Sequence, residues 1–558
     1  MVPKLKITKA LDRLSSNPTI KNSIYLSSTI VFFALILLPP IFGIIIKWNT
    51  MQEVLNKPDL ITSALTSIQN SFIIALLVST LDVITGIPLA WLIARGKSRW
   101  INVLDTLADV PFIVPTAALG YSLLLFWNEP SGAASLFGNS LVSPGWLLVT
   151  LLHFTFSYPV VVRVMVGALL DYRLEYERAA RTLSASPLTA ARTVTFPILK
   201  PSIVAAFILA FARSISETGA TMIVAGLAFE NGPVFIQKMK DNFNAGIISK
   251  STYEGATVFA SLILIIISFT IFAVIRILGQ RAKIPLNKFW PSIERKLSYS
   301  KAQTGRNSVT LLVFFFIIIV PSLFVAFPAV EALFTNTLSD AFSSAGVWKD
   351  YWQSLTLSYL LGAVVTILNI IIGLPMAIIL ARKKFGTLLS PMLDLLINIP
   401  LIVPSIALGV SLSFFWKENF TFIPEIWLLV FAHMAITYPY FVRSMSAAIE
   451  RINVDLEEAS RTLGAKPLTV FRTIILPLTK YSILSGAILV FTRSVSETGA
   501  TLAVVSTLQT APVVIVNWVK TKGLATPLEI GLGCGFLILF SFIILLTLRL
   551  IARGKGRY

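Results

Sequence analysis

The sequence predicts an all-helical protein that crosses a membrane about 12 times, as two parallel repeats of six helices. Composition, the spacing of apolar runs and an internal duplication lead to this fold class. Hydrophobic residues make up 55% of the 558 residues and charged residues only 13%, whereas a soluble domain carries about 25% charged residues. The mean hydropathy of +0.80 agrees. The chain has too little polar surface for a water-soluble globule.

Apolar runs long enough to cross a bilayer recur along the chain, each needing about 20 residues of helix. The third and ninth runs are interrupted by prolines, which membrane helices tolerate when neighbouring groups satisfy the freed backbone. The predicted spans are 24–46, 66–94, 107–128, 146–170, 200–228, 255–279, 308–330, 354–381, 394–416, 425–448, 481–506 and 526–551.

Basic residues predict the orientation of these spans. With the N-terminus inside, 35 of the 46 Lys and Arg residues fall on the cytoplasmic side, 9 fall outside, and Arg213 and Arg493 lie within spans. Short loops rich in Lys and Arg stay cytoplasmic. We therefore expect a multi-pass protein of the plasma (inner) membrane with both termini in the cytoplasm. The net charge of +19 is then a topology signal, and no nucleic-acid partner is expected.

The chain is an internal duplication. Residues 151–226 align with 431–506 without a gap, and 34 of the 76 positions are identical. Upstream, PFIVPTAALG (111–120) matches PLIVPSIALG (400–409). An even number of spans in each repeat makes both repeats enter the membrane in the same direction. The predicted parts are a cytoplasmic tail (1–22), a first bundle (23–279), a cytoplasmic linker (280–307), a second bundle (308–551) and a cytoplasmic tail (552–558).

Each repeat has a structured cytoplasmic loop between its fourth and fifth spans, at about 171–198 and 450–478. In the second loop, DLEEASRTLG (455–464) carries acidic residues in its first turn and glycine at its end, which is typical of a short helix. A second helix starts after it and reaches Pro477. The helix–turn–helix is either a cap lying on the membrane or a docking site for a partner, presented twice and suited to a dimer.

The second loop resembles the EAA signature of permease subunits of ATP-binding-cassette (ABC) importers. Glu458-Ala459-Ser460 is followed by Gly464 and by Ile475-Leu476-Pro477 at the spacing of that family. The first copy is looser, with Arg178-Ala179-Ala180 and with Ser184 in the glycine place. Glu177 matches Glu457, one position before the glutamate of the motif. The resemblance covers nearly the whole chain.

The resemblance implies that both loops are coupling helices seated on a nucleotide-binding subunit. The residues expected to carry this coupling are Glu177, Ala179, Ala180, Ser184, Glu457, Glu458, Ala459 and Gly464. A dimeric cytoplasmic ABC ATPase and an extracytoplasmic substrate-binding protein are the expected partners, with the bilayer around the chain. ATP and Mg²⁺ would bind the ATPase. This chain should hold no cofactor and should not be an enzyme, since a phosphate-binding G-x-x-x-x-G-K-[ST] loop is missing.

Charged residues within spans are costly and mark transport pathways by default. Arg213 and Glu217 are four residues apart, as are Arg493 and Glu497. Each pair therefore shares a helix face and can neutralise itself. We keep two interpretations: structural ion pairs that fix helix packing, or side chains that line the translocation path, where the resemblance places the fifth helix of each repeat.

The two histidines, His153 and His433, occupy equivalent positions in the fourth spans. They are either buried groups bonded to neighbouring helices or a paired site on the translocation path. A metal site is not predicted, since the chain has 2 His and 1 Cys. Paired His and Glu side chains could meet a cation such as ferric iron, while the arginines suit an anion.

The substrate stays open between two branches of the resembled family. The fused two-bundle layout resembles ferric-iron and thiamine permeases, which we favour because the layout covers more of the chain. The SETGAT segments (216–221 and 496–501) look more like the oxyanion branch for sulfate, molybdate or tungstate. The alternative class is a 6+6 secondary transporter driven by an ion gradient, which would not need two docking loops.

Overall fold

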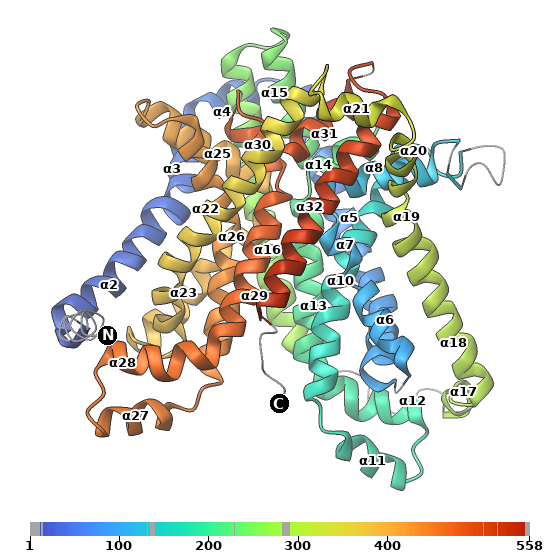
Figure 1. The fold of residues 1–558 in the computed structure, drawn as a ribbon, viewed down its shortest axis with the longest axis vertical. Helices are drawn as coiled ribbons and strands as arrows, with labels where there is room; N and C mark the ends of the chain where they lie inside the picture. Colours follow the sequence, from blue (N-terminus) through green and yellow to red (C-terminus); the bar gives the residue numbers. More distant parts are fainter. Residues whose placement is uncertain are drawn as a thin grey trace.

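The computed structural model describes residues 12, 15–96, 98–130, 132–133, 140–227, 229–281, 291–505, 507–521 and 523–552. Over these ranges the regular structure is helical throughout. Ten helices are long and apolar enough to cross a membrane, or up to 12 if each of two bent helix pairs counts as one span. This confirms the predicted all-helical fold. Figure 1 shows the spans running roughly along the long axis of the molecule, with the short helices at its two ends.

The first repeat contains five long spans and one bent pair. Its elements are α2 (Pro18–Val31), η1 (Phe32–Leu37), α3 (Leu38–Ile46), α4 (Trp48–Leu55), α5 (Pro58–Arg95), α6 (Arg99–Leu107), α7 (Val110–Ile113), α8 (Thr116–Trp127), α10 (Trp146–Asp171), α11 (Leu174–Thr182), α12 (Pro187–Ala190), η2 (Ala191–Thr195), α13 (Phe196–Ser216), α14 (Gly219–Val224), α15 (Gly232–Asn244) and α16 (Lys250–Arg281). Helix α17 (Pro291–Leu297) lies in the linker.

The second repeat follows the same order. Its elements are α18 (Ser300–Leu312), η3 (Val313–Ile319), α19 (Val320–Leu323), α20 (Ala326–Ala332), α21 (Asn336–Phe342), α22 (Trp348–Ala381), α23 (Gly386–Ile397), α24 (Ile399–Ile402), α25 (Ser405–Asn419), α26 (Glu425–Glu450), α27 (Val454–Thr462), α28 (Pro467–Val470), η4 (Phe471–Ile475), α29 (Leu476–Val495), α30 (Gly499–Val504), α31 (Ala511–Lys520) and α32 (Pro527–Ala552).

The third and ninth spans are bent where prolines interrupt the predicted runs 107–128 and 394–416. Both helix pairs turn by 104°, between Ile113 and Thr116 and between Ile402 and Ser405. Pro115 and Pro404 stand at these turns as the N-caps of α8 and α25. Proline lacks a backbone N–H and restricts the residue before it, so the helix stops and starts again in a new direction.

The fifth and eleventh spans also stop earlier than the predicted 200–228 and 481–506. Helix α13 ends at Ser216, and Glu217 is extended with φ −78° and ψ 131°. The chain then forms a short second helix, α14, and α30 follows α29 in the same way. Thr218 and Thr498 are the N-caps of the two short helices. Each fifth span therefore carries a break just after its arginine.

The first helix of each repeat packs on the other repeat. Helices α2 and α3 pack on α22 and α25, while α18 and α19 pack on α5 and α8. The Ser28 hydroxyl donates to the Ile372 carbonyl at 2.7 Å, and the Ser122 hydroxyl donates to the Pro321 carbonyl at 2.6 Å. Figure 1 shows α2 beside second-repeat helices and α18 beside first-repeat helices. Both buried apolar cores accordingly draw residues from the two repeats.

The segments that precede these exchanged helices bind the two predicted coupling loops. Glu294 of α17 accepts hydrogen bonds from Thr189 at 2.6 Å and from the Arg192 guanidinium at 2.5 Å. The hydrogen bond from Thr189 and the charge of Arg192 lower the pKa of the Glu294 carboxyl. In the other repeat, Asp12 accepts from Thr469 at 2.9 Å. The rest of the predicted linker and tails, at 1–11, 13–14, 282–290 and 553–558, lies outside the described residues.

The exchange can be tested at Gly43, where α3 approaches α25 so closely that a Cβ would overlap the Ser411 carbonyl oxygen. We expect Gly43→Ala to destabilise the protein by about 1–3 kcal/mol through overpacking. Gly305→Ala on α18 is the matched control, because a Cβ there meets open space and alanine favours helix. Thermal unfolding in detergent measures both variants. Equal unfolding temperatures would contradict the tight contact between α3 and α25.

Candidate translocation site and coupling surface

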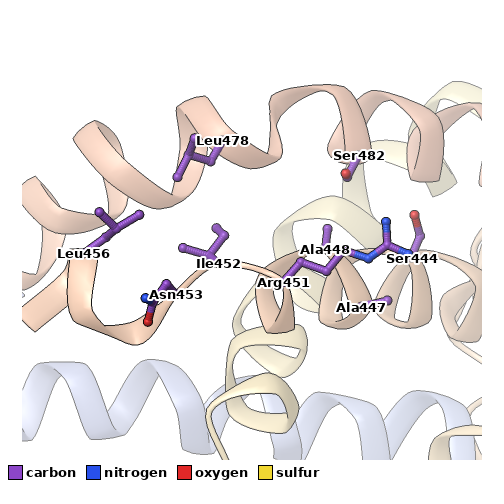
Figure 2. A pocket seen from close by; sticks show the side chains of 9 residues that line it. All are labelled: Ser444, Ala447, Ala448, Arg451, Ile452, Asn453, Leu456, Leu478 and Ser482. Carbon is purple, nitrogen blue, oxygen red and sulfur yellow. The ribbon is translucent and has the colours of Figure 1, made fainter. Parts of the chain in front are cut away.

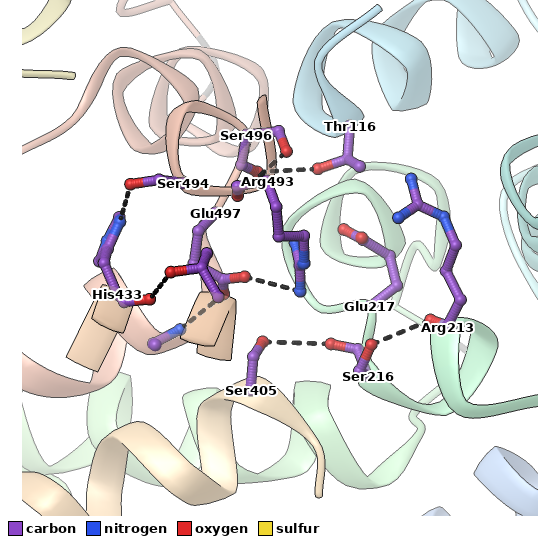
Figure 3. Close-up of polar contacts among 12 residues, drawn as sticks. Thr116, Arg213, Ser216, Glu217, Ser405, His433, Arg493, Ser494, Ser496 and Glu497 are labelled. Carbon is purple, nitrogen blue, oxygen red and sulfur yellow. Dashed lines mark hydrogen bonds and ion pairs between the residues drawn. The ribbon is translucent and has the colours of Figure 1, made fainter. Parts of the chain in front are cut away.

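The two broken fifth spans meet the two bent third spans where the repeats face each other. The Thr116 hydroxyl, at the start of α8, donates to the Ser496 carbonyl at 3.2 Å. The Ser405 hydroxyl, at the start of α25, donates to the Ser216 carbonyl at 3.1 Å. These bonds are equivalent and reciprocal, each crossing from one repeat to the other (Figure 3). The carbonyls that the helix breaks leave free are thus satisfied by the opposite repeat.

Glycines allow the two breaks to touch. A Cβ on Gly499 would lie 2.7 Å from the Thr218 hydroxyl, and a Cβ on Gly219 would overlap the Thr498 side chain. Both glycines and both threonines are buried. Any larger residue at either glycine would push the repeats apart at this level. The structure therefore holds the two halves in direct contact at the breaks.

Four charged side chains surround this contact, and their arrangement is asymmetric. Arg493 forms an ion pair with Glu497 at 2.7 Å, and both side chains are nearly buried. Figure 3 shows the Arg493 side chain between Glu497 and Glu217. Arg213 instead donates to the Phe156 carbonyl at 3.1 Å and lies over an aromatic ring. The predicted self-neutralising pair forms in the second repeat only.

The prediction of a pair between Arg213 and Glu217 is wrong. Glu217 and Glu497 both lie beyond the last residue of their helices, α13 and α29, so the difference between the repeats lies in the surroundings of the two arginines. The guanidinium of Arg213 lies 5.2 Å from the Phe112 ring and 5.1 Å from the Phe156 ring. Leu401 and Ile436 stand at the equivalent positions in the second repeat, so Arg493 has no such aromatic pair.

Glu217 and Glu497 have a second, equivalent role at the breaks. The Glu217 carboxylate accepts from the Ala220 backbone N–H at 3.0 Å, and Glu497 accepts from Ala500 at 3.0 Å. The N-terminal N–H groups of a helix have no partner within the helix, and an acidic side chain there is favourable. Both glutamates therefore stabilise the start of the short helices α14 and α30. Their predicted contact with a transported solute stays a prediction.

His153 and His433 brace the same breaks. The imidazole of His153 is hydrogen-bonded to Ser214 at 2.8 Å and Thr221 at 2.9 Å, before and after the break. His433 meets Ser494 and Thr501, each at 2.9 Å. Both rings are buried with both nitrogens in use. Each fourth span thus holds the two sides of the neighbouring break, and a role on the translocation path remains a prediction.

Lys240 of the first repeat binds backbone carbonyls of the second repeat. Lys240 of α15 donates to the carbonyls of Leu502, Ala503 and Val505 at the end of α30, the last two at 3.3 and 3.4 Å. A cation at a helix C-terminus is favourable. Burial, reinforced by the charge of Lys417, lowers the pKa of Lys240 to about 8. Next to it, Asp241 forms an ion pair with Lys520 of α31 at 3.1 Å.

At the other end of the molecule, the predicted coupling loops form two equivalent helix–turn–helix units. Glu177 of α11 lies 3.6 Å from the guanidinium of Arg95, at the end of α5. Glu457 of α27 binds Arg382, just after α22, at 2.7 Å. These two equivalent carboxylates anchor each loop to the second span of its own repeat. Glu458, the glutamate of the EAA-like signature, is exposed instead.

The turn after each short helix is left-handed. Gly464 has φ +85° and Ser184 has φ +69°. Glycine adopts this conformation without strain, whereas serine does so at a cost of about 1 kcal/mol. The first repeat keeps the turn without the glycine. Ala179, Ser184, Ala459 and Gly464 are exposed on the loops, and Ala180 is half-buried.

Two leucines that the sequence reasoning missed dominate the exposed surface of these loops. Leu183 is 84% exposed and Leu463 is 88% exposed. They stand at equivalent positions, directly before the left-handed residue. The sequence pattern that could have identified them is a leucine that follows Arg-Thr at the same place in both otherwise polar loops. Figure 1 shows α11 and α27 projecting from the same end of the molecule.

A groove of about 700 Å³ lies beside the second loop, between the end of α26 and the start of α29. Figure 2 shows its lining residues, which include Arg451, Asn453 and Leu478. In the first repeat Tyr172 and Tyr176 replace Ile452 and Leu456, and their rings lie 6.3 Å apart. Larger side chains thus distinguish this region of the first repeat from the groove of the second.

Metal ligands are not gathered in the part of the chain that the structure describes: no three His, Cys, Asp or Glu side chains there could hold a metal ion together. The candidate site is therefore built of hydroxyls, backbone carbonyls and two Arg and two Glu side chains.

The fold, the internal duplication and the paired broken helices define a polytopic membrane component built of two equivalent halves. The family described as the inner membrane component of binding-protein-dependent transport systems matches residues 86–284 and 373–554, more than half of the chain. The chain belongs to this family. It is thus a permease of an ABC importer in the inner membrane, is not itself an enzyme, and has no cofactor assigned to it by the family. Systems of this kind include a binding protein and an ATPase.

The relatives align with less than half of this chain but with most of their own length. The sulfate transport system permease protein CysT of Salmonella typhimurium is 29% identical over 212 residues, 36% of this chain and 74% of the relative. The molybdate/tungstate transport system permease protein WtpB of Methanocaldococcus jannaschii is 31% identical over 218 residues, 38% and 85%. The molybdenum transport system permease protein ModB of Mycobacterium bovis is 29% identical over 273 residues, 46% and 91%.

The asymmetric charges lead to a prediction for the two arginines. Arg493→Met would remove the partner of buried Glu497, and breaking a buried pair from one side costs about 3–5 kcal/mol. Arg213→Met would leave that ion pair in place, so we expect a smaller loss. Unfolding temperatures of the two purified variants measure the difference. Equal losses, or a larger loss for Arg213→Met, would show that the pair between Arg493 and Glu497 does not dominate.

Proposed function

We propose that the chain is the fused permease of an ABC importer for a tetrahedral oxyanion of the sulfate, molybdate or tungstate type. The observation that carries the permease role is the pair of equivalent cytoplasmic loops, each presenting an exposed leucine beside an anchored carboxylate. The substrate class is supported by the names of the relatives, which are sulfate and molybdenum or molybdate/tungstate permeases. These names favour the oxyanion branch over the ferric-iron and thiamine branch.

The translocation path runs along the line where the two repeats meet. The broken fifth spans and bent third spans form its constriction through Thr116, Ser216, Ser405 and Ser496. Hydroxyl groups, and the backbone N–H groups at the starts of α14 and α30, are donors of the kind that a dehydrated anion needs. Arg213 adds a cation that forms no ion pair within the described residues. The contact at the breaks corresponds to a resting state in which the path is shut.

A dimeric cytoplasmic ATPase drives the opening. Leu183 and Leu463 each insert into a groove on one ATPase subunit, and the left-handed turns at Ser184 and Gly464 present them. Glu177 and Glu457 transmit the movement to the second spans through Arg95 and Arg382. The N- and C-termini lie in the cytoplasm with these loops. The binding protein delivers the anion at the opposite end, around α15 and α31.

The docking of the ATPase is tested by Leu463→Asp. We expect the folded chain to lose co-purification with its ATPase, and transport to fall at least about tenfold, because a buried charge in an apolar contact costs several kcal/mol. Leu297→Asp is the control, since Leu297 is an exposed cytoplasmic leucine outside the loops. Retained ATPase binding by Leu463→Asp would contradict the docking role, and so would equal losses in both variants.

The substrate class is tested by uptake into vesicles that contain the permease with its ATPase and binding protein. We expect ATP-dependent uptake of labelled molybdate or sulfate, with competition by other tetrahedral oxyanions. Ferric citrate and thiamine should not compete. Uptake of ferric iron or thiamine without oxyanion uptake would overturn the proposed substrate while leaving the permease role intact.

A further inference from the structure

A carboxylic acid is buried in the first repeat where the second repeat has an amide. Asp82 of α5 corresponds to Asn369 of α22, as the matching positions of Gly86 with Gly373 and Pro88 with Pro375 show. Both side chains have no exposed surface. Each faces a hydroxyl on the fourth span of its own repeat, Ser157 for Asp82 and Thr437 for Asn369. The two sites therefore pair equivalent positions and differ in the acid against the amide and in a serine against a threonine.

In the second repeat the direction of the hydrogen bonds follows from the amide. Asn369 donates through Nδ2 to the Thr437 hydroxyl at 2.8 Å. Thr437 in turn donates its single proton to the His433 carbonyl at 2.6 Å. The result is a chain of two bonds that runs from the second span to the backbone of the fourth span.

The first repeat has the same second bond. Ser157 lies 2.6 Å from the His153 carbonyl and is also hydrogen-bonded to Oδ2 of Asp82. A serine hydroxyl has one proton to donate. If that proton goes to the His153 carbonyl, as it does from Thr437, then the bond to Asp82 needs a proton from the acid.

The surroundings of Asp82 favour the acid over the carboxylate. Its Oδ1 atom is buried without a hydrogen-bond partner, and no cation in the described part of the chain forms an ion pair with the carboxyl group. The packing is tight one turn further on, where a Cβ on Gly86 would lie 3.1 Å from Val161. An isolated charge in such a site would cost many kcal/mol, whereas a neutral acid retains one good hydrogen bond.

We propose that Asp82 is a permanently protonated acid that donates to Ser157 and so positions the fourth span of the first repeat, as the Asn369 amide does in the second. The polar chain continues to the break, because the ring of His153 holds Ser214 and Thr221 on its two sides. Asp82 is a positioning residue: it sets the place of α10, and α10 holds the constriction. This role does not depend on the identity of the substrate.

Infrared difference spectroscopy tests the protonation state directly. The spectrum of the wild-type permease minus that of Asp82→Asn should contain the C=O stretch of a protonated carboxylic acid. Asn369→Asp is the matched variant, and its spectrum minus that of the wild type should contain the same band. Paired carboxylate bands in the wild-type difference would overturn the proposal. If Asp82→Asn does not fold, the Asn369→Asp difference decides alone by the same criterion.

Function provides the second readout in the assembled transporter. Asp82→Asn should keep ATP-dependent transport within about twofold of the wild type, because the amide supplies the same donor. Asp82→Ala should lower both transport and the unfolding temperature, since it removes that donor and leaves a cavity. A loss of transport in Asp82→Asn as large as that in Asp82→Ala would show that a carboxylate is required and would overturn the proposal.

Discussion

The structure depends on how the backbone groups freed at four helix breaks are satisfied inside a membrane. Lipid offers no hydrogen bonds, so a broken helix is tolerated only where protein covers it. Here each repeat covers the break of the other, through Thr116 to Ser496 and through Ser405 to Ser216. The contact between the two breaks is therefore made by both repeats together.

The exchange of the first helices also holds the two repeats in a fixed position relative to each other. Each first helix crosses to the other repeat, and the segment before it binds the predicted coupling loop there, through Glu294 in one half and Asp12 in the other. A displacement of either loop thus pulls on a helix of the opposite repeat as well as on its own second span. Each loop is therefore bonded to elements of both repeats, which is expected of a transporter whose two repeats move together.

The all-helical class and the duplication could be predicted from the sequence, because they depend on composition and on identities at a fixed offset. The positions of the two loops followed from helix signals such as the acidic first turn of α27. The break after Ser216 was not predicted, because Glu217, Thr218 and Gly219 stand within an apolar run long enough to cross a membrane as one continuous helix. Its cause is the hydrogen bond from Ala220 to Glu217 and the contact with the other repeat. The exchanged helices were invisible for the same reason: hydropathy carries no information about which apolar face packs on which.

Fusion of the two repeats into one chain explains why equivalent positions differ. In a symmetric dimer every substitution appears twice, so an arginine could not have a carboxylate partner in one half and aromatic partners in the other. Here Arg493 is paired with Glu497, while Arg213 lies against Phe112 and Phe156. Lys240 caps α30, whereas the end of α14 receives the Gly145 backbone N–H. The histidine braces and the reciprocal bonds at the breaks are kept in both halves. The shared groups hold the contact between the breaks, and the groups that diverged lie around it, so the two halves differ in charge while the contact between them is kept.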